Sequence, residues 1–424
     1  MAQNIIYYGP PGTGKTYLLQ SMLNDYTDFD ITDAQIISAY TRNSKEWLLI
    51  ALIILQNKGK MQATDIQAKV DSLVLRTHVR VSSVLEKHQI SPSPIHALRE
   101  NPRIFFEVSL GTGWYVDRIR LLKHDPHFFE TYLSTSDVDK RYSFVTFHQS
   151  FSYEDFIEGI RPTYDAATHT IDYSPKPGIF KLICEKAINH PEKEYAIFID
   201  EINRGNIAEI FGELISLIEV DKRKGEASEL SAELPYSKER FVVPNNLNIL
   251  GTMNSADKSI ANIDIALRRR FSFVPMAPDS NIILRELEIA GIDAHNVDGI
   301  DLIALFETIN KRIEILLDAN HLIGHAYFMS VRTKEDIAII LAQKIIPLLE
   351  EYFYDDLQKI QLIFNDLDSD GNLKPTAIYQ NSTLSVDTLF PFTGEYLLDD
   401  KKRFFTRSPI DDNALRQIYE GITP

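Results

Sequence analysis

The sequence IIYYGPPGTGKT, from Ile5 to Thr16, decides the fold of this chain. It opens with β-branched and aromatic residues, which favour a strand. A turn rich in glycine and proline follows, and Lys-Thr then precedes the helical pattern of residues 17–23. The spacing from Gly9 to Thr16 matches G-x-x-x-x-G-K-[ST]. We therefore predict a strand, a phosphate-binding turn and a helix, in this order.

Each residue type in this turn suits a bound triphosphate. Glycines lack a Cβ, so the backbone N–H groups can curl around a phosphate. The N-terminus of the following helix adds a partial positive charge. We expect Lys15 to reach the outer phosphates and the Thr16 hydroxyl to hold Mg²⁺.

A second phosphate-transfer signature lies in residues 194–201, EYAIFIDE, where four apolar residues end in Asp200 and Glu201. Parallel strands that are buried on both faces read as continuous apolar runs, and such sheets bind ligands at their carboxyl ends. We expect Asp200 to hold the Mg²⁺ shell through water and Glu201 to polarise the attacking water. The predicted nucleotide-binding residues are Gly9, Pro10, Pro11, Gly12, Thr13, Gly14, Lys15, Thr16 and Asp200, with Thr16 and Asp200 at the metal.

Further candidate residues follow the next predicted strand, residues 246–254, which ends in Asn254. An amide at that edge can bond the attacking water or the terminal phosphate. Arg204, three residues after Glu201, can orient that carboxylate or reach a phosphate. Arginines 268–270 precede an aromatic strand and do not suit an apolar core; they suit a finger supplied to a neighbouring subunit's nucleotide. The predicted catalytic residues are Glu201, Asn254, Arg204, Asp257, Arg269 and Arg270.

Composition limits the class of protein. The 424 residues are 44% apolar and 25% charged, which is typical of soluble globular proteins with two to four domains at this length. The longest apolar run, residues 47–55, is too short to span a membrane. The single cysteine, Cys184, excludes an internal disulfide framework and a cysteine metal site. The chain enters the nucleotide strand at once, so we expect no signal peptide, no membrane contact and a cytoplasmic location.

The charge is uneven along the chain. The formal net charge of −16 argues against a protein that coats nucleic acid. Between Thr41 and Arg120, however, twelve Lys and Arg stand against seven Asp and Glu. This basic island is either a nucleic-acid surface or a chance excess on a solvated face.

The same region, residues 44–120, reads as an inserted domain. Ser44 is a candidate N-cap for a helix over 45–57, and helices over 63–75 and 81–88 follow. Two strands then flank the turn Leu110-Gly111-Thr112-Gly113. This pattern resembles winged-helix modules of the HARE-HTH kind. The resemblance implies a DNA-facing third helix, with Arg80, Ser82, Ser83 and Lys87; the alternative is a winged helix that docks protein.

The remaining chain completes the expected architecture. We predict a second strand over 35–40, a buried strand over 142–147 and a helix over 207–220. Residues 279–358 are rich in helical patterns and would form a lid, in which we expect His325 to sense nucleotide. The tail, 359–424, is less regular. Its Asp366–Gly371 segment imitates a calcium loop, but position twelve is Ala377 instead of Glu, so we reject calcium there.

At this point the motifs resemble a known family. The phosphate-binding turn, IDEINR (199–204), and MNSADKS (253–259) followed by ALRRRF (266–271) are similar to the AAA+ motor subunit of the McrB type. That family's signature is Met-Asn-Thr-Ala-Asp-Arg-Ser, so Ser255 and Lys258 are conservative departures. Residues 323–328 and 346–353 resemble that family's lid. The resemblance covers residues 1–40 and 141–360.

The resemblance implies an α/β AAA+ P-loop NTPase, with a doubly wound parallel sheet, an inserted winged-helix-like domain and a helical lid. The expected domains are the core (1–40 and 141–278), the insertion (44–120), the lid (279–358) and a C-terminal extension (359–424). The family also implies GTP in preference to ATP, Mg²⁺, a homo-oligomeric ring that is typically a hexamer, and a McrC-like nuclease partner acting on DNA in a restriction system. Asn254 and Asp257 belong to its GTPase signature.

The family usually carries an N-terminal domain that binds modified DNA. We do not expect that domain here, because the motor motifs begin near residue 1. Target recognition would then lie in the insertion, in the partner, or outside this chain. Two other functions stay open from the residues alone: an ATP-dependent AAA+ protein remodeller, and a DNA-binding regulator that uses nucleotide as a structural ligand.

Overall fold

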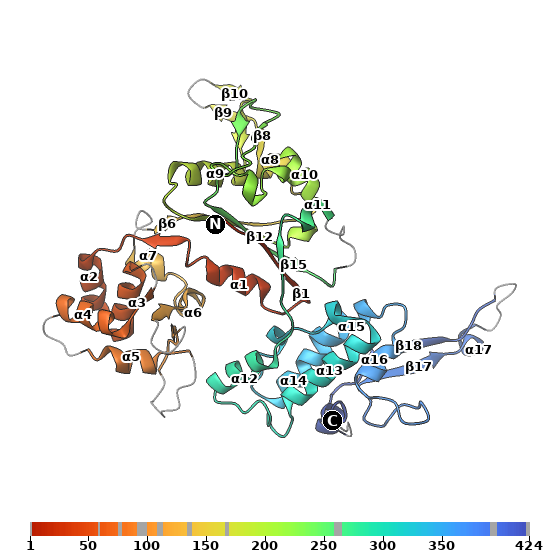
Figure 1. The fold of residues 1–424 in the computed structure, drawn as a ribbon. Coiled ribbons are helices and arrows are strands. Elements are labelled where there is room, and N and C mark those ends of the chain that lie inside the picture. Colours follow the sequence, from red (N-terminus) through yellow and green to blue (C-terminus); the bar gives the residue numbers. More distant parts are fainter. Residues whose placement is uncertain are drawn as a thin grey trace. The chain divides into compact units, whose positions relative to one another are not determined.

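The computed structural model describes residues 2–57, 60–74, 79–90, 100–107, 113–133, 138–165, 169–257, 265–390 and 397–420. The chain forms two compact units (Figure 1). The first contains residues 1–8 and 15–275, and the second contains residues 9–14 and 276–424. The turn Gly9–Gly14 is thus grouped with the C-terminal unit, although its neighbours in sequence belong to the first.

A five-stranded sheet forms the centre of the first unit. Its order is β16–β1–β15–β12–β7, and β1 pairs in parallel with β16, as β12 does with β15 and β7. The order confirms the predicted doubly wound sheet. The strands are β1 (Asn4–Gly9), β7 (Tyr142–Thr146), β12 (Tyr195–Asp200), β15 (Leu247–Asn254) and β16 (Ser272–Pro275).

Successive side chains of β12 are buried on opposite faces of this sheet. Tyr195, Ile197 and Ile199 pack in one cluster with α9 (Ile179–Asn189). Ala196 and Phe198 pack on the other face with Leu19 of α1 (Lys15–Met22). Because side chains of a strand alternate between faces, the continuous apolar run serves both helices.

The structure corrects three expected elements of the core. Residues 35–40 lie in α2 (Asp33–Asn43), which starts at a capping box between Thr32 and Gln35. β7 is an edge strand with partly exposed residues, because it is the last in the sheet order. The expected helix 207–220 stops early, because Gly212 has a φ of +50° and the Tyr153 ring lies against it.

Short elements surround that break. The region from 153 to 268 contains α8 (Tyr153–Phe156), α10 (Ile207–Phe211), α11 (Ile265–Arg268) and one-turn 3-10 segments at Ile202–Arg204, Gly212–Ser216 and Val220–Lys222. Three small antiparallel ribbons also occur there: β8 (Glu158–Ile160) with β11 (Pro175–Pro177), β9 (Thr163–Asp165) with β10 (Thr170–Asp172), and β13 (Ala232–Glu233) with β14 (Arg240–Phe241).

A separate hydrophobic cluster belongs to the inserted region. Its centre is α3 (Glu46–Gln56), whose residues 47–55 are all buried, so that the helix is apolar on every side. The cluster runs from Phe29 to Leu133 and is therefore wider than the expected domain. Ser44 does not cap α3; it ends α2 in a left-handed conformation with a φ of +53°. The antiparallel ribbon of β2 (Thr27–Phe29) and β6 (Val138–Lys140) joins the segments at the two ends of this region.

The elements around α3 include the two further helices and the two strands predicted from the sequence, together with a short strand and two helices that were not predicted. They are β3 (Lys60–Met61), α4 (Ala63–Leu73), α5 (Val81–Lys87), β4 (Phe105–Glu107), β5 (Trp114–Val116), α6 (Arg118–His124) and α7 (Phe128–Tyr132). The three strands form a sheet in the order β3–β5–β4. Of the expected turn at 110–113, only Gly113 lies within the described residues.

The second unit is largely helical. Its helices are α12 (Ser280–Ile289), α13 (Leu302–Leu316), α14 (Lys334–Ile340), α15 (Ile346–Tyr352), α16 (Gln358–Ile363), α17 (Val386–Leu389) and α18 (Asp412–Gln417). A π-helical turn, Leu341–Ile345, joins α14 to α15, and 3-10 turns occupy Ala319–His321 and His325–Tyr327.

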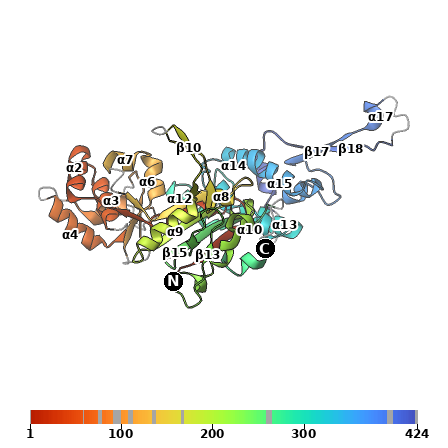
Figure 2. The same cartoon turned by 90° about the horizontal axis from the view of Figure 1, so that it is seen from above.

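The tail is more regular than its sequence pattern indicates. β17 (Tyr379–Leu384) and β18 (Lys401–Thr406) form an antiparallel ribbon, with α17 at its far end (Figure 2). Asp366, at the start of the rejected calcium loop, is buried and accepts the backbone N–H groups of Ile378 and Tyr379 at 2.8 and 2.7 Å. That aspartate therefore has a structural role.

Candidate functional site

The phosphate-binding turn has the backbone that its sequence predicts. Gly12 and Gly14 have φ values of +77° and +79°, a region that residues with a Cβ rarely adopt. Thr13 donates its hydroxyl to the Pro10 carbonyl at 3.0 Å and is buried. Lys15 then begins α1. The turn is thus tight and glycine-dependent, as anion-binding turns before a helix are.

Thr16 and Asp200 come together at the carboxyl edge of the sheet. The Thr16 hydroxyl lies 3.2 Å from both carboxylate oxygens of Asp200. A hydroxyl and a carboxylate are hard oxygen donors of the kind that Mg²⁺ prefers, with phosphates completing its shell. The residues present therefore fit the expected ion. The described residues contain no group of three or more His, Cys, Asp or Glu that could hold a metal by themselves.

Thr252 is a site residue that sequence reasoning missed. It is buried near the end of β15 and donates its hydroxyl to the Asp200 carboxylate. The Thr252 hydroxyl oxygen also accepts the Glu201 backbone N–H at 3.1 Å. Thr252 therefore fixes both acidic residues from the neighbouring strand. Its polar side chain, two positions before Asn254 near the carboxyl end of the predicted strand, was the signal available in the sequence.

Glu201 has the environment of a general base. Its φ of +53° is unusual for a residue with a side chain and turns the chain sharply after β12. Burial raises the pKa of its carboxyl; Asp200 and Asp257 add to that shift and Arg204 opposes it. Arg204 lies with its Nε 3.4 Å from Glu201 Oε2 and an Nη 3.3 Å from Asp257 Oδ2. Arg204 thus joins the two acids, as one of its two predicted roles requires.

Lys15 and Asn254 complete this part of the site. Burial lowers the pKa of Lys15 to about 8, while Glu201, Asp200 and Asp257 act to raise it. A bound phosphate would favour the charged amine further, so nucleotide binding by this lysine should be linked to proton uptake above about pH 8. Asn254 accepts the Ala256 backbone N–H on its side-chain oxygen at 3.2 Å, and its carbonyl accepts Asn203 Nδ2 at 3.1 Å.

The three predicted arginines do not share one environment. Arg268 and Arg269 are exposed, whereas Arg270 is buried and pairs with Glu219 at 2.9 Å. The Arg270 carbonyl also accepts Asn4 Nδ2 at 2.9 Å. A guanidinium enters a protein interior when a carboxylate compensates its charge, and Glu219 does so here. The expectation that Arg270 projects as a finger is therefore wrong for this conformation, and Arg269 remains the candidate.

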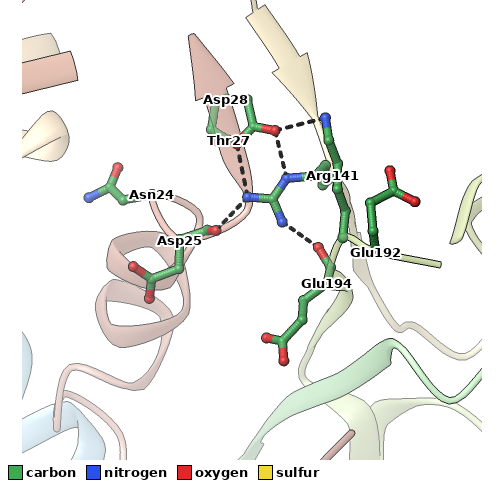
Figure 3. A pocket seen from close by; sticks show the side chains of 8 residues that line it. Asn24, Asp25, Thr27, Asp28, Arg141, Glu192 and Glu194 are labelled. Atoms are coloured by element: carbon green, nitrogen blue, oxygen red, sulfur yellow. Dashed lines mark hydrogen bonds and ion pairs between the residues drawn. The ribbon is translucent and has the colours of Figure 1, made fainter. Parts of the chain in front are cut away.

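A polar hollow at the opposite edge of the sheet is structural. A cavity of about 290 Å³ is lined by groups around Arg141, which precedes β7 (Figure 3). Arg141 donates to Asp28 Oδ2 at 3.0 Å, to the Asp25 carbonyl at 2.8 Å and to the Glu194 carbonyl. Arg141 therefore ties the end of α1 and the β2 strand to the starts of β7 and β12. The cavity lies at the amino ends of these strands, away from Asp200.

Within the second unit, His325 lies on a loop, residues 323–328, that contacts the turn Gly9–Gly14 of the same unit. His325 is buried, and its Nδ1 accepts the Asp279 backbone N–H at 3.2 Å. Burial lowers the pKa of its imidazole. A histidine that accepts on Nδ1 and resists protonation carries its proton on Nε2.

Among the helices of the described ranges, none is long and apolar enough to cross a membrane.

Comparison with known proteins identifies two segments. A family model described as "AAA domain (dynein-related subfamily)" matches residues 129–271, which include Asp200 and Asn254. A model described as "McrB, alpha-helical lid domain" matches residues 301–361. The phosphate-binding turn lies upstream of the first match, beyond the inserted region. The two models therefore cover the strands that end in Asp200 and Asn254 and most of the expected lid, but not the phosphate-binding turn.

Two curated relatives are similar over part of the chain. The type IV methyl-directed restriction enzyme EcoKMcrB subunit of Escherichia coli (strain K12) is 40% identical over 260 residues, which cover 57% of this chain and 53% of that protein. The type II restriction enzyme BsuMI component YdiS of Bacillus subtilis (strain 168) is 31% identical over 134 residues, which cover 29% of this chain and 37% of that protein. The chain thus spans about half of the first relative and less of the second.

A solved structure from Cytophaga hutchinsonii aligns with 47% of this chain and 62% of its own, at 14% identity and a TM-score of 0.23, which is too low to carry an argument. The sheet order, the phosphate-binding turn, the acidic edge and the two family models agree with one another. The chain therefore has the α/β AAA+ P-loop fold, and its core and lid segments are similar to those of McrB-type proteins.

Proposed function

We propose that this protein is the GTP-hydrolysing motor subunit of a restriction system, which assembles into a ring and drives a McrC-like nuclease on DNA. The proposal depends on the contacts around Asp200. The hydroxyls of Thr16 and Thr252 both contact its carboxylate, and Thr252 also accepts the Glu201 backbone N–H. Similarity to subunits named as restriction enzymes supports the biological setting. A cytoplasmic location fits such a role.

The residues divide the chemistry among them. Lys15 would neutralise the outer phosphates, and Glu201 would accept a proton from the attacking water. Thr252 holds Asp200 and the Glu201 backbone in register, while Arg204 restrains the Glu201 side chain. Mg²⁺, held by Thr16 and Asp200, would supply charge neutralisation of the phosphate oxygens. Asn254 would bond the attacking water or the terminal phosphate, and Asp257 would act through its ion pair with Arg204.

Arg269 would complete the site from a neighbouring subunit. It is exposed beside the start of β16, whereas Arg270 is held inside by Glu219. Arginine fingers supplied in trans increase hydrolysis by about 10³–10⁵-fold. A ring of identical subunits provides each site with its neighbour's finger; a hexamer is the arrangement that the McrB resemblance implies.

A competition assay tests this function. Purified protein would be given GTP and ATP together, with and without the McrC-like partner, and the products would be separated. We expect GTP to be the preferred substrate and the partner to stimulate turnover. Lys15→Ala and Arg269→Ala subunits should each be inactive alone, and an equal mixture should regain activity because each supplies what the other lacks. The matched control Arg268→Ala should stay active. Strong preference for ATP would favour a protein remodeller instead, and a mixture without recovery would exclude the finger in trans.

We also propose that the inserted region is a winged helix that contacts DNA through α5. The helices α3, α4 and α5 with the sheet β3–β5–β4 are consistent with that fold. Arg80 and Ser82 are exposed and Ser83 is half-buried, whereas Lys87 pairs with Glu100 at 2.9 Å. Arg80 is therefore the more available cation, and Lys87 would have to exchange Glu100 for a phosphate.

Alanine at Arg80 and Lys87 should weaken DNA binding and reduce its salt dependence by about one phosphate contact each. Fluorescence anisotropy with a DNA duplex at several salt concentrations would measure both quantities. Lys69→Ala is the control, because Lys69 on α4 is engaged with Asp33 at 2.8 Å. Unchanged DNA affinity in the double variant would favour a surface that docks protein.

A further inference from the structure

The second unit holds the phosphate-binding turn through backbone hydrogen bonds. The Gly324 N–H donates to the Pro11 carbonyl at 3.1 Å, and the Ala326 N–H donates to the Gly12 carbonyl at 2.9 Å. A Cβ placed on Gly324 would lie 2.0 Å from the Gly12 carbonyl carbon and 2.5 Å from the Pro11 oxygen. The two backbones therefore touch at a position where only glycine fits. We call residues 323–328 the lid loop.

Side chains of the lid loop enclose the same turn. A Cβ on Gly12 would lie 2.7 Å from the ring of Tyr327, so the ring covers that glycine. His325 places its Nε2 3.6 Å from a Cβ built on Gly14. The other ring nitrogen of His325 accepts from the backbone of Asp279, the N-cap of α12. The lid loop is thus fixed at the start of α12 and at the turn.

Because peptides are planar, these contacts determine the direction of two backbone N–H groups in the turn. In a planar trans peptide, the carbonyl of one residue and the N–H of the next point in opposite directions. A Pro11 carbonyl that faces the lid loop therefore turns the Gly12 N–H away from it. In the same way, a Gly12 carbonyl held by Ala326 turns the Thr13 N–H away. Both N–H groups then face the side of the turn that the lid loop leaves open.

We propose that the lid loop orients the turn for phosphate binding before nucleotide arrives, and that Gly324 is the positioning residue for it. The ligand class is the phosphate chain of a nucleoside triphosphate or diphosphate, which accepts from backbone N–H groups. This inference rests on the proposed nucleotide function and deepens it. It makes phosphate affinity depend on the lid, because a displaced lid loop releases the two carbonyls and frees the peptides to rotate.

Gly324→Ala in the full chain tests the proposal. The added methyl cannot coexist with the Gly12 backbone, so both hydrogen bonds should be lost. We expect the Kd values for fluorescent GTP and ATP analogues to rise by the same factor, about 10–100-fold, because the loss concerns phosphates that both nucleotides share. The ratio of the two Kd values should stay unchanged. Lys311→Ala is the control: Lys311 lies on α13 of the same unit, and its side chain is 75% exposed.

Hydrogen exchange of the unsubstituted protein supplies a second test that needs no variant. The amides of Gly324 and Ala326 should be protected about 100-fold without nucleotide, because they already donate to the turn. Protection that appears only after GDP is added, or not at all, would overturn the proposal. So would unchanged Kd values in a folded Gly324→Ala protein, or a changed GTP-to-ATP ratio. If the unsubstituted protein binds neither nucleotide, the proposed function itself fails, which the binding assay reveals before any variant is compared.

Discussion

Glu201→Gln should bind nucleotide nearly as tightly as the unsubstituted protein and hydrolyse it about 10²–10⁴-fold more slowly. Glutamine keeps the size of the side chain but cannot accept a proton from water. The supporting geometry does not depend on the carboxylate, because Thr252 accepts the backbone N–H of residue 201. Single-turnover hydrolysis and a separate binding titration would measure the two quantities independently.

The pH dependence of the same reaction provides an internal check. Burial raises the pKa of Glu201 above its usual value, and only the ionised carboxylate can act as a base. Turnover should therefore fall as the pH drops through that raised pKa, and the residual turnover of Glu201→Gln should lack this acid limb. Glu209→Gln, an exposed acid on the following helix, is the control. Turnover of Glu201→Gln within about tenfold of normal would contradict the assignment of Glu201 as the base.

The same variant separates the competing functions. A motor can no longer drive its partner when hydrolysis stops. A DNA-binding regulator that uses nucleotide as a structural ligand still binds DNA. DNA affinity should therefore be compared in Glu201→Gln with GTP present. Full regulatory function without turnover would favour the regulator. This result is informative only because the substitution leaves the Asp200 and Thr16 contact in place.

Patterns with a local physical cause were predictable from the sequence. The apolar run before Asp200 and the glycines of the turn specify their backbone without help from distant residues, and both are confirmed. Residues 35–40 show how a local signal can be overlooked: Ile36 and Ile37 favour a strand, but Thr32 and Gln35 form a capping box that starts a helix. There the cap and the core contacts of Ile36 and Ala39 outweigh β propensity.

Features that need a distant partner were not predictable. Arg270 looks exposed in a run of three arginines, and its carboxylate, Glu219, stands in another part of the sequence. The contact of Gly324 with Gly12 joins residues more than three hundred positions apart. A sequence pattern records that a glycine is present, but not which backbone approaches it. The candidate acids and the turn were therefore identified, whereas Thr252 and the lid loop required the structure.

A buried ion pair away from the nucleotide site should have the largest effect on stability. Glu158, at the start of β8, is fully buried, and its Oε2 lies 3.0 Å from Lys181 Nζ on α9. Its Oε1 accepts the backbone N–H groups of Tyr236 and Ser237 at 3.1 and 2.9 Å. Lys181 also lies 2.6 Å from Glu239. One carboxylate thus fastens α9 to the loop between β13 and β14.

The titration of this pair indicates how stability should vary with pH. Burial alone would raise the pKa of Glu158, but hydrogen bonds from Ser237 and Lys181 outweigh it and lower that pKa. A carboxyl with a lowered pKa in the folded state contributes stability above its unfolded pKa, and this contribution is lost as the pH falls through the folded value. Lys181 has a raised pKa, because Glu239 and Glu158 outweigh its burial. Its contribution is present below its unfolded pKa and is lost as the pH rises through the folded value.

Glu158→Ala should lower the opening free energy of this core by about 3–5 kcal/mol, because it leaves two backbone N–H groups without their acceptor and leaves Lys181 with only the exposed Glu239 as its partner. Hydrogen exchange of the α9 and β12 amides would measure that free energy without assuming two-state unfolding of the whole chain. The control removes an exposed pair, Glu307 and Lys311 on α13, where an alanine at Glu307 should cost less than about 1 kcal/mol.

A second substitution tests how much of the cost comes from the ion pair with Lys181. With Lys181 also replaced, by methionine, the interior holds no ammonium that has lost its buried partner, so Glu158→Ala should cost less in that background than alone. Equal costs in both backgrounds would show that the backbone N–H groups of Tyr236 and Ser237, and not Lys181, are what Glu158 chiefly serves. A loss below about 1 kcal/mol for Glu158→Ala itself would contradict the pairing, because a fully buried carboxylate with three donors cannot be removed that cheaply.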